Sequence, residues 1–366
     1  MKIEYKAVGI MSGTSCDGID LSLVKTDGLS YANSIYSFYV PYAQKLQTRL
    51  LYMIKSCDYS DVLNIERDLT IAYAQAVNWF REKYDIHGVD LIGMHGQTIK
   101  HDSDAGVTWQ IGNPELLATY CKVDVVYDFR KKDMIYGGQG APIIAVYHKL
   151  LAKRLIYHRI LIINLGGIVN ITWYNKYNSV LRAMDVCVCN ALMNDWLSLF
   201  GYRDGSYDQD GELALKGKVS KRFRKFLQSA ITVNTKYPRA LDRDCSSISA
   251  YDHQISVYDG LATIASFIPE SIVRTLKSLE WYPDITVVAG GGRKHKLLFR
   301  NLQIAFQKYN ATDCIDVNNI GEDGDSLEAS AFAYLAVRSL LNYPITGPEL
   351  TGASDNISGG ILCKYR

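Results

Sequence analysis

The stretch VGIMSGTSCDGIDLSLV, residues 8–24, joins two apolar segments through a loop of small residues. Gly13 and Gly18 can adopt a positive φ without a Cβ clash, so the backbone can turn tightly and aim its N–H groups inward. The apolar segments on either side of the loop have the length and composition of β-strands. We therefore expect a strand–turn–strand unit near the start of the chain.

The polar groups of this loop are of the kinds that hold nucleotide phosphates and the metal ion bound to them. Thr14 and Ser15 add hydroxyl donors, and Asp17 and Asp20 can hold Mg²⁺ through its water ligands. The pattern differs from the P-loop, because no Gly-Lys-Ser/Thr ending follows and a strand comes next where the P-loop has a helix. The loop is interpreted as a cradle for nucleotide phosphates. An ordinary glycine-rich hairpin turn is the alternative.

The composition bounds the class of protein. A chain of 366 residues exceeds what one core usually supports, so we expect two domains. The net charge of +2 argues against a nucleic-acid partner, and the first residues carry no apolar leader segment. No apolar stretch approaches the roughly 20 residues that span a bilayer, so no membrane partner is expected. The 8 cysteines fit reduced thiols, and we expect a cytoplasmic location.

The hydrophobic pattern repeats one theme along the chain: an apolar strand, a glycine turn and a second apolar strand. Strands are predicted at 5–11, 18–26, 32–40, 90–94, 107–111, 160–165, 168–173, 285–289 and 312–317. Helices are predicted at 43–55, 61–84, 142–153, 190–200, 211–228, 257–279 and 325–341, with a further helix beginning at Pro114 behind the capping residue Asn113. The two occurrences of the theme indicate two similar α/β domains.

Three glycine turns, each after an apolar strand, lie at 12–18, 166–167 and 290–292. Turns so far apart in the sequence suggest strand ends that meet at one nucleotide in a cleft between two domains. This is the arrangement of the actin-like, ribonuclease H-like fold, in which two hairpins hold the phosphates and a third turn packs against adenine. We expect one domain from residues 1–127 plus 342–366 and another from 128–341.

A more specific resemblance covers nearly the whole chain. Residues 11–20 resemble the signature of the anhydro-N-acetylmuramic acid kinases, with Cys16 where the family usually has Leu. Further motifs follow in the family's order: His95-Gly96-Gln97-Thr98, Gln110 to Pro114, Asp128-Phe129-Arg130, Gly137 to Pro142, Asn164 to Thr172, Tyr207 to Gly211, Glu328-Ala329, and the tail from Thr351 to Gly360.

The resemblance implies an enzyme that uses ATP, Mg²⁺ and water to open the 1,6-anhydro ring of a cell-wall amino sugar and phosphorylate its O6. Such a reaction needs a base that activates water at the anomeric carbon, and Asp185 stands where the family has its catalytic aspartate. Without the resemblance, Asp185 could equally be a surface or helix-capping residue. Small-molecule partners, the amino sugar and ATP, are therefore expected, and a homodimer is left open.

The same resemblance implies the other site residues. The ATP-binding residues are Gly13, Thr14, Ser15, Cys16, Asp17, Gly18, Ile19, Asp20, Gly166, Gly167, Gly290, Gly291 and Gly292, and Asp17 and Asp20 hold the metal through water. The substrate-binding residues are His95, Gln97, Thr98, Arg130 and Glu328. Arg130 suits the lactyl carboxylate because a guanidinium binds a carboxylate with two parallel hydrogen bonds. The alternatives are a solvated Arg130 in a basic trio and a Glu328 that is only a helix-face carboxylate.

Two segments depart from the family pattern. Residues 186–189 read Val-Cys-Val-Cys where the family has Thr-Gly-Pro-Gly/Ala, so we expect a different backbone path or the family path under strain. His295 and Lys296 stand where the family has Asn and Pro, which affects contacts to adenine more than phosphate transfer. Two other functions stay open: a kinase of this fold for another small substrate, and an ATP- or sugar-binding protein that has lost catalysis.

Overall fold

The computed structural model describes residues 4–13, 15–202, 206–241, 248, 251, 255–310 and 312–366. Contacts divide the chain into two compact units, residues 1–151 with 325–366 and residues 152–324. The expected boundaries lay elsewhere, at 127/128 and 341/342. The second boundary differs because helix α10 (Leu327–Leu340) packs on strands β1, β2 and β4 of the first unit.

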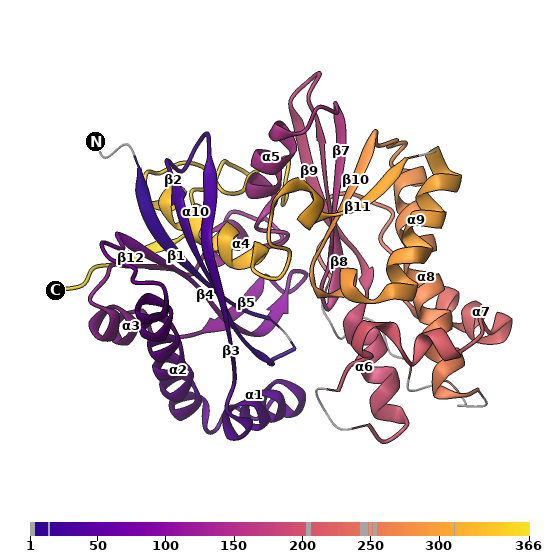
Figure 1. Ribbon diagram of the computed structural model, residues 1–366, viewed down its shortest axis with the longest axis horizontal. Coiled ribbons are helices and arrows are strands. Elements are labelled where there is room, and N and C mark those ends of the chain that lie inside the picture. Colours follow the sequence, from indigo (N-terminus) through magenta and orange to yellow (C-terminus); the bar gives the residue numbers. More distant parts are fainter. Residues whose placement is uncertain are drawn as a thin grey trace. The chain divides into compact units, whose positions relative to one another are not determined.

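The first unit is built on a mixed sheet with the strand order β12-β6-β4-β1-β2-β3, and β5 pairs with β4 (Figure 1). Strands β1 to β3 form an antiparallel meander, while β4 runs parallel to β1 and β6 runs parallel to β4. The strands are β1 (Tyr5–Ser12), β2 (Gly18–Thr26), β3 (Ala32–Pro41), β4 (Leu91–Asp102), β5 (Val107–Ile111), β6 (Val125–Tyr127) and β12 (Ile361–Cys363). The predicted strand–turn–strand unit at residues 8–24 is confirmed.

Helices cover both faces of this sheet. Val8 and Ile10 join a core with residues of α1 (Gln44–Ser56), α2 (Val62–Lys83) and α3 (Pro114–Cys121). Gly9 faces the other way, because side chains alternate along a strand. A Cβ on Gly9 would lie 1.8 Å from the Ala329 carbonyl oxygen, and one on Gly93 would lie 2.3 Å from the Phe332 carbonyl oxygen. Helix α10 therefore packs on that face only because both strands carry glycine there.

The second unit repeats the same strand order. Its sheet has the order β11-β10-β7-β8-β9, with β7 to β9 antiparallel and with β10 and β11 parallel to β7 (Figure 1). The strands are β7 (Arg159–Leu165), β8 (Ile168–Asn175), β9 (Val180–Val188), β10 (Ile285–Ala289) and β11 (Asp313–Asp316). An antiparallel meander followed by two parallel strands occurs in both units. The prediction of an α/β protein with two ribonuclease H-like domains is therefore confirmed.

One face of the second sheet forms a large apolar core with the helices around it. The helices are α6 (Asn190–Leu199), α7 (Lys221–Ala230), α8 (Val257–Ser278) and α9 (Lys296–Asn310). The predicted helix at 211–228 is wrong in its first half. Residues 209–211 and 214–216 form the short 3₁₀ helices η1 and η2, and α7 begins only at Lys221, behind the capping side chain of Ser220. Gly211, with a φ of 75°, and Gly217 interrupt the helical pattern there.

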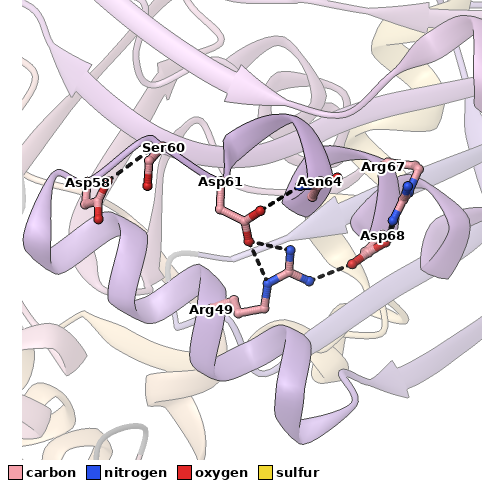
Figure 2. Close-up of polar contacts among 7 residues, drawn as sticks. All are labelled: Arg49, Asp58, Ser60, Asp61, Asn64, Arg67 and Asp68. Carbon is pink, nitrogen blue, oxygen red and sulfur yellow. Dashed lines mark hydrogen bonds and ion pairs between the residues drawn. The ribbon is translucent and has the colours of Figure 1, made fainter.

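Helices α1 and α2 of the first unit are joined by a cluster of charges (Figure 2). Arg49 donates to Asp61 at 2.7 Å and to Asp68 at 2.6 Å, and Asn64 donates to Asp61 at 2.8 Å. Hydrogen bonds from Asn64 and Arg49 lower the pKa of Asp61, and those from Arg49 and Arg67 lower the pKa of Asp68.

Within the described ranges, no helix is long and apolar enough to cross a membrane.

Candidate active site

The turn between β1 and β2 is tight, but its geometry differs from the expected one. The Cys16 N–H donates to the Gly13 carbonyl at 3.1 Å, and Cys16 has the left-handed φ of 53° that was expected of the glycines. Gly18 is required for another reason, since its Cβ would lie 2.6 Å from the Val40 carbonyl oxygen on β3. The exposed Ser15 hydroxyl donates to Asp17 at 2.6 Å. Thr14 lies outside the described residues.

The turn is held in place by Gln97 on β4. The Gln97 side-chain amide is buried, donates to the Gly13 carbonyl at 3.0 Å and accepts from the Ser12 hydroxyl at 2.5 Å. Ser12 also contacts the Tyr42 hydroxyl. Burial raises the pKa of Tyr42 well above its usual range. Both ends of the Gln97 amide are therefore engaged inside the protein. They fix the start of the turn relative to β4.

His95 and Thr98 lie in the same strand as Gln97. The strand predicted at 90–94 continues to Asp102, so the His95-Gly96-Gln97-Thr98 motif lies within β4 and not at its end. The Thr98 hydroxyl accepts from the Gln110 amide at 3.3 Å. His95 is buried and accepts a hydrogen bond from Arg130 Nε at 3.1 Å. The structure thus brings His95 and Arg130 together.

Glu328 is half-buried and lies in the first turn of α10. It directly precedes Ala329, whose carbonyl packs against Gly9. A carboxylate in this position is stabilised by the positive end of the helix dipole. The close packing of α10 against β1 and β4 fixes the height of Glu328 above the sheet. The first unit therefore contains the turn between β1 and β2, Arg130 and Glu328.

Asp185 belongs to the second unit and is held from three directions. It lies within β9, which runs from Val180 to Val188. Its backbone N–H donates to the Arg239 carbonyl at 2.9 Å, its carbonyl accepts from the Asn234 amide at 2.9 Å, and its Oδ2 accepts from the Leu241 N–H at 2.9 Å. The carboxylate is buried, and the Leu241 N–H fixes the position of its Oδ2.

Residues 186–189, which differ from the family pattern, lie at the junction of β9 and α6. The strand ends at Val188 and the helix begins at Asn190, so a single residue separates them. Cys187 and Cys189 are fully buried. Burial raises the pKa of the Cys189 thiol well above its usual range, with Cys187 adding to the effect. Both side chains pack in the apolar core of the second unit. They behave here as small apolar residues.

The second glycine turn, Gly166-Gly167, is covered by the start of α6. The Gly167 carbonyl accepts from the N–H of Cys189 at 2.8 Å, and the Gly166 carbonyl accepts from the N–H of Asn190 at 3.1 Å. The Asn190 side-chain amide donates to the Leu165 carbonyl at 3.1 Å. The turn therefore satisfies N–H groups that a helix start leaves without internal partners.

The third glycine turn leads into α9. Gly290 has a φ of 80°, and its Cβ would lie 2.4 Å from the Asn164 side-chain oxygen, while Gly291 faces open space. His295 Nδ1 accepts from the Leu298 N–H at 3.2 Å, so this histidine caps α9. Its Nε2 then carries the proton and lies 3.3 Å from Asp208.

The Asp208 carboxylate connects the third turn to the segment that precedes α7. Burial alone would raise its pKa, but His295 and the N–H groups of Leu213 and Ala214 outweigh this effect and lower it. Lys296 lacks the advantage of Pro at a helix start, yet α9 begins there because His295 supplies the cap.

Sequence reasoning missed Asp133, which holds the loop next to Arg130. Asp133 is fully buried, and its carboxylate accepts from the Gly140 N–H at 2.8 Å and from the Thr351 hydroxyl at 2.6 Å. A Cβ on Gly138 would lie 2.2 Å from Asp133 Oδ2, so the loop closes on this carboxylate only with glycine. The glycine-rich motif at 137–142 was the available signal.

A divalent cation would have two carboxylates of the first hairpin as neighbours. Asp17 is exposed, and Asp20 is half-buried opposite Met11. Among the described residues, no group of three or more metal-ligating side chains occurs. Two carboxylates fit a Mg²⁺ that keeps most of its water and gains its other ligands from phosphate.

Comparison with known proteins agrees with the family resemblance. The family model for anhydro-N-acetylmuramic acid kinase matches residues 5–364. Proteins of that name from Brucella canis and Zymomonas mobilis are 36% and 35% identical to this chain, in each case covering 97% of it and 98% of the relative. A relative of the same name from Rhizobium etli is 34% identical and covers 99% of both chains. The chain therefore belongs to the anhydro-N-acetylmuramic acid kinase family.

Proposed function

We propose that this kinase opens the 1,6-anhydro ring of anhydro-N-acetylmuramic acid with water and transfers the γ-phosphoryl group of ATP to O6. The product is N-acetylmuramic acid 6-phosphate, and the reaction belongs to cell-wall recycling. The observation that carries the proposal is the family match over residues 5–364.

In this proposal Asp185 is the base that takes a proton from the attacking water. The Leu241 N–H anchors Oδ2 and thereby fixes the orientation of the carboxylate. The other oxygen then has a defined direction in which to accept the proton. As water attacks the anomeric carbon, its bond to the bridging oxygen breaks, and that oxygen, now O6, attacks the γ-phosphorus while ADP leaves.

The first turn is proposed to hold the ATP phosphates, with Ser15 and the backbone of residues 13–20 as donors. Gly166-Gly167 and Gly290 to Gly292 are proposed to complete the nucleotide site. Mg²⁺, held through water by Asp17 and Asp20, would neutralise phosphate charge when bound. Support comes from the exposure of Ser15 and Asp17 and from the hydrogen bond by which Gln97 holds the Gly13 carbonyl at the start of the turn.

Arg130 and Glu328 are proposed to bind the sugar. Arg130 suits the lactyl carboxylate, because its guanidinium can donate two parallel hydrogen bonds to a carboxylate. Glu328 suits a sugar hydroxyl, because a carboxylate accepts hydrogen bonds from it. Thr98 would add a hydroxyl contact.

The test is incubation with Mg²⁺–ATP and the anhydro sugar, with ADP release and product mass measured together. The proposal predicts a sugar product that has gained one phosphate and one water. A gain of phosphate alone would indicate a kinase without ring opening. Saturable binding without ADP release would indicate a binding protein that has lost catalysis.

A further inference from the structure

A bulge in β4 determines the position of His95. Met94 pairs with Ile10 of β1, but Gln97 pairs with Ser12, so β4 has one extra residue between these pairs. Gly96 adopts a φ of 80° in the bulge, and a Cβ there would lie 2.7 Å from the Ile111 carbonyl oxygen. Such a bulge redirects the side chains next to it. The His95 ring lies in a buried site with its centroid 4.6 Å from that of Phe332.

Both ring nitrogens of His95 have partners, and the partners fix the tautomer. Arg130 Nε can only donate, so His95 Nε2, at 3.1 Å, must accept. Nδ1 then carries the proton and donates to the Gly96 carbonyl at 2.8 Å. Burial, followed by the charge of Arg130, holds the pKa of His95 well below its usual range. The imidazole is therefore neutral at physiological pH.

A second acceptor holds the other edge of the Arg130 guanidinium. Arg130 Nη1 donates to the Gly140 carbonyl at 2.7 Å, and Gly140 is itself held by the buried Asp133. The imidazole nitrogen and the backbone carbonyl carry no formal charge. They therefore fix the plane of the guanidinium without themselves adding a negative charge to it.

We propose that His95 is a positioning residue: its neutral imidazole orients the Arg130 guanidinium for the carboxylate of the sugar. The proposal rests on the proposed function, in which Arg130 binds the lactyl group, and it replaces direct contact of His95 with the substrate. The effect of His95 should then appear only with a substrate that has a carboxylate. It should also disappear when Arg130 is removed.

The experiment compares His95→Met, which removes the acceptor at similar side-chain length, with His95→Gln, which keeps an acceptor near Nε2. Each is assayed with 1,6-anhydro-N-acetylmuramic acid and with 1,6-anhydro-N-acetylglucosamine, which lacks the lactyl carboxylate. We expect His95→Met to raise KM for the first sugar about tenfold, with kcat and the KM for ATP nearly unchanged. His95→Gln should restore most of the loss. With the second sugar, His95→Met should match the wild type.

A double-mutant cycle completes the test. In an Arg130→Met background, His95→Met should have no further effect on KM for the first sugar. Equal losses for both sugars, or additive losses in the double variant, would overturn the proposal.

An independent measurement separates this proposal from the proposed function. Nitrogen NMR of the wild-type imidazoles should show His95 neutral, with the proton on Nδ1, and Arg130→Met should shift the Nε2 resonance. A proton on Nε2 would overturn the positioning role, even if the folding of the His95 variants fails. A wild type that does not act on the muramic sugar would refute the proposed function and, with it, the assigned carboxylate.

Discussion

The two units use the same strand order but support their first turns differently. In the first unit, the Gln97 amide from β4 donates to the Gly13 carbonyl, and Ser15 and Asp17 remain exposed. In the second unit, the Asn190 amide donates to the Leu165 carbonyl, and the start of α6 covers the glycine turn as well. The first turn is thus held by a buried side-chain amide together with the backbone hydrogen bonds of Cys16 and Tyr42, whereas the second is covered by the start of a helix. The repeated fold leaves polar groups accessible at one turn and places a fixed carboxylate, Asp185, on a strand of the other sheet.

The largest effect should come from the carboxylate of the second unit. Asp185→Asn keeps an oxygen that can accept from the Leu241 N–H but removes the base, so kcat should fall about 10³-fold. The backbone N–H and carbonyl of residue 185 keep their contacts to Arg239 and Asn234, so the fold should persist. Steady-state ADP release, with Mg²⁺–ATP binding measured by calorimetry, checks this. Undiminished turnover would refute the assignment of Asp185.

The support of the two turns can be compared directly by removing each amide. Gln97→Met removes the buried side-chain donor of the Gly13 carbonyl and leaves the Cys16 N–H as a donor to it, and the KM for ATP should rise about tenfold. Asn190→Leu is the matched variant in the second unit and should change this KM about threefold or less, because the helix N–H groups still hold the turn. A larger effect from Asn190→Leu would contradict the difference between the turns.

The folds of both units follow from visible sequence patterns, but the supports of the sites do not. Apolar runs and glycines are local signals, and they predicted the first hairpin, while the family resemblance singled out Asp185. Gln97 and Gly13 are 84 positions apart, and Asp133 and Thr351 are 218 apart. No local pattern reports such a pairing. The positive φ at Cys16 was also missed, because the conformation of that turn depends on packing against β3 and β4 as well as on residue type.

A smaller effect should come from the cap of α9. His295→Leu removes both the acceptor for the Leu298 N–H and the partner of Asp208, so the second unit should lose about 1 kcal/mol of stability. His295→Asn, a residue that caps helices well, should recover part of this loss. Denaturant melts followed by Trp fluorescence would measure both variants. Equal stability of the Leu variant and the wild type would show that the cap contributes nothing.

The smallest effect should come from the charge cluster of α1 and α2 (Figure 2). Arg49→Met should lower the melting temperature by about 2 °C or less, and Arg67→Met, which loses only an exposed contact to Asp68, should lower it less. The pKa values of Asp61 and Asp68 are lowered in the folded state, so their contribution is present above about pH 4 and is lost as the pH falls further. Thermal melts at neutral and acidic pH would show this. A difference that persists at low pH would contradict the ionic origin.

The central claim is that water attacks the sugar while phosphate moves to O6, and the position of solvent oxygen in the product tests it most directly. Turnover of ATP and the anhydro sugar in ¹⁸O-labelled water should place one labelled oxygen at the anomeric carbon and none in the phosphate. A product with an unlabelled anomeric carbon, or with the label in phosphate, would contradict this account.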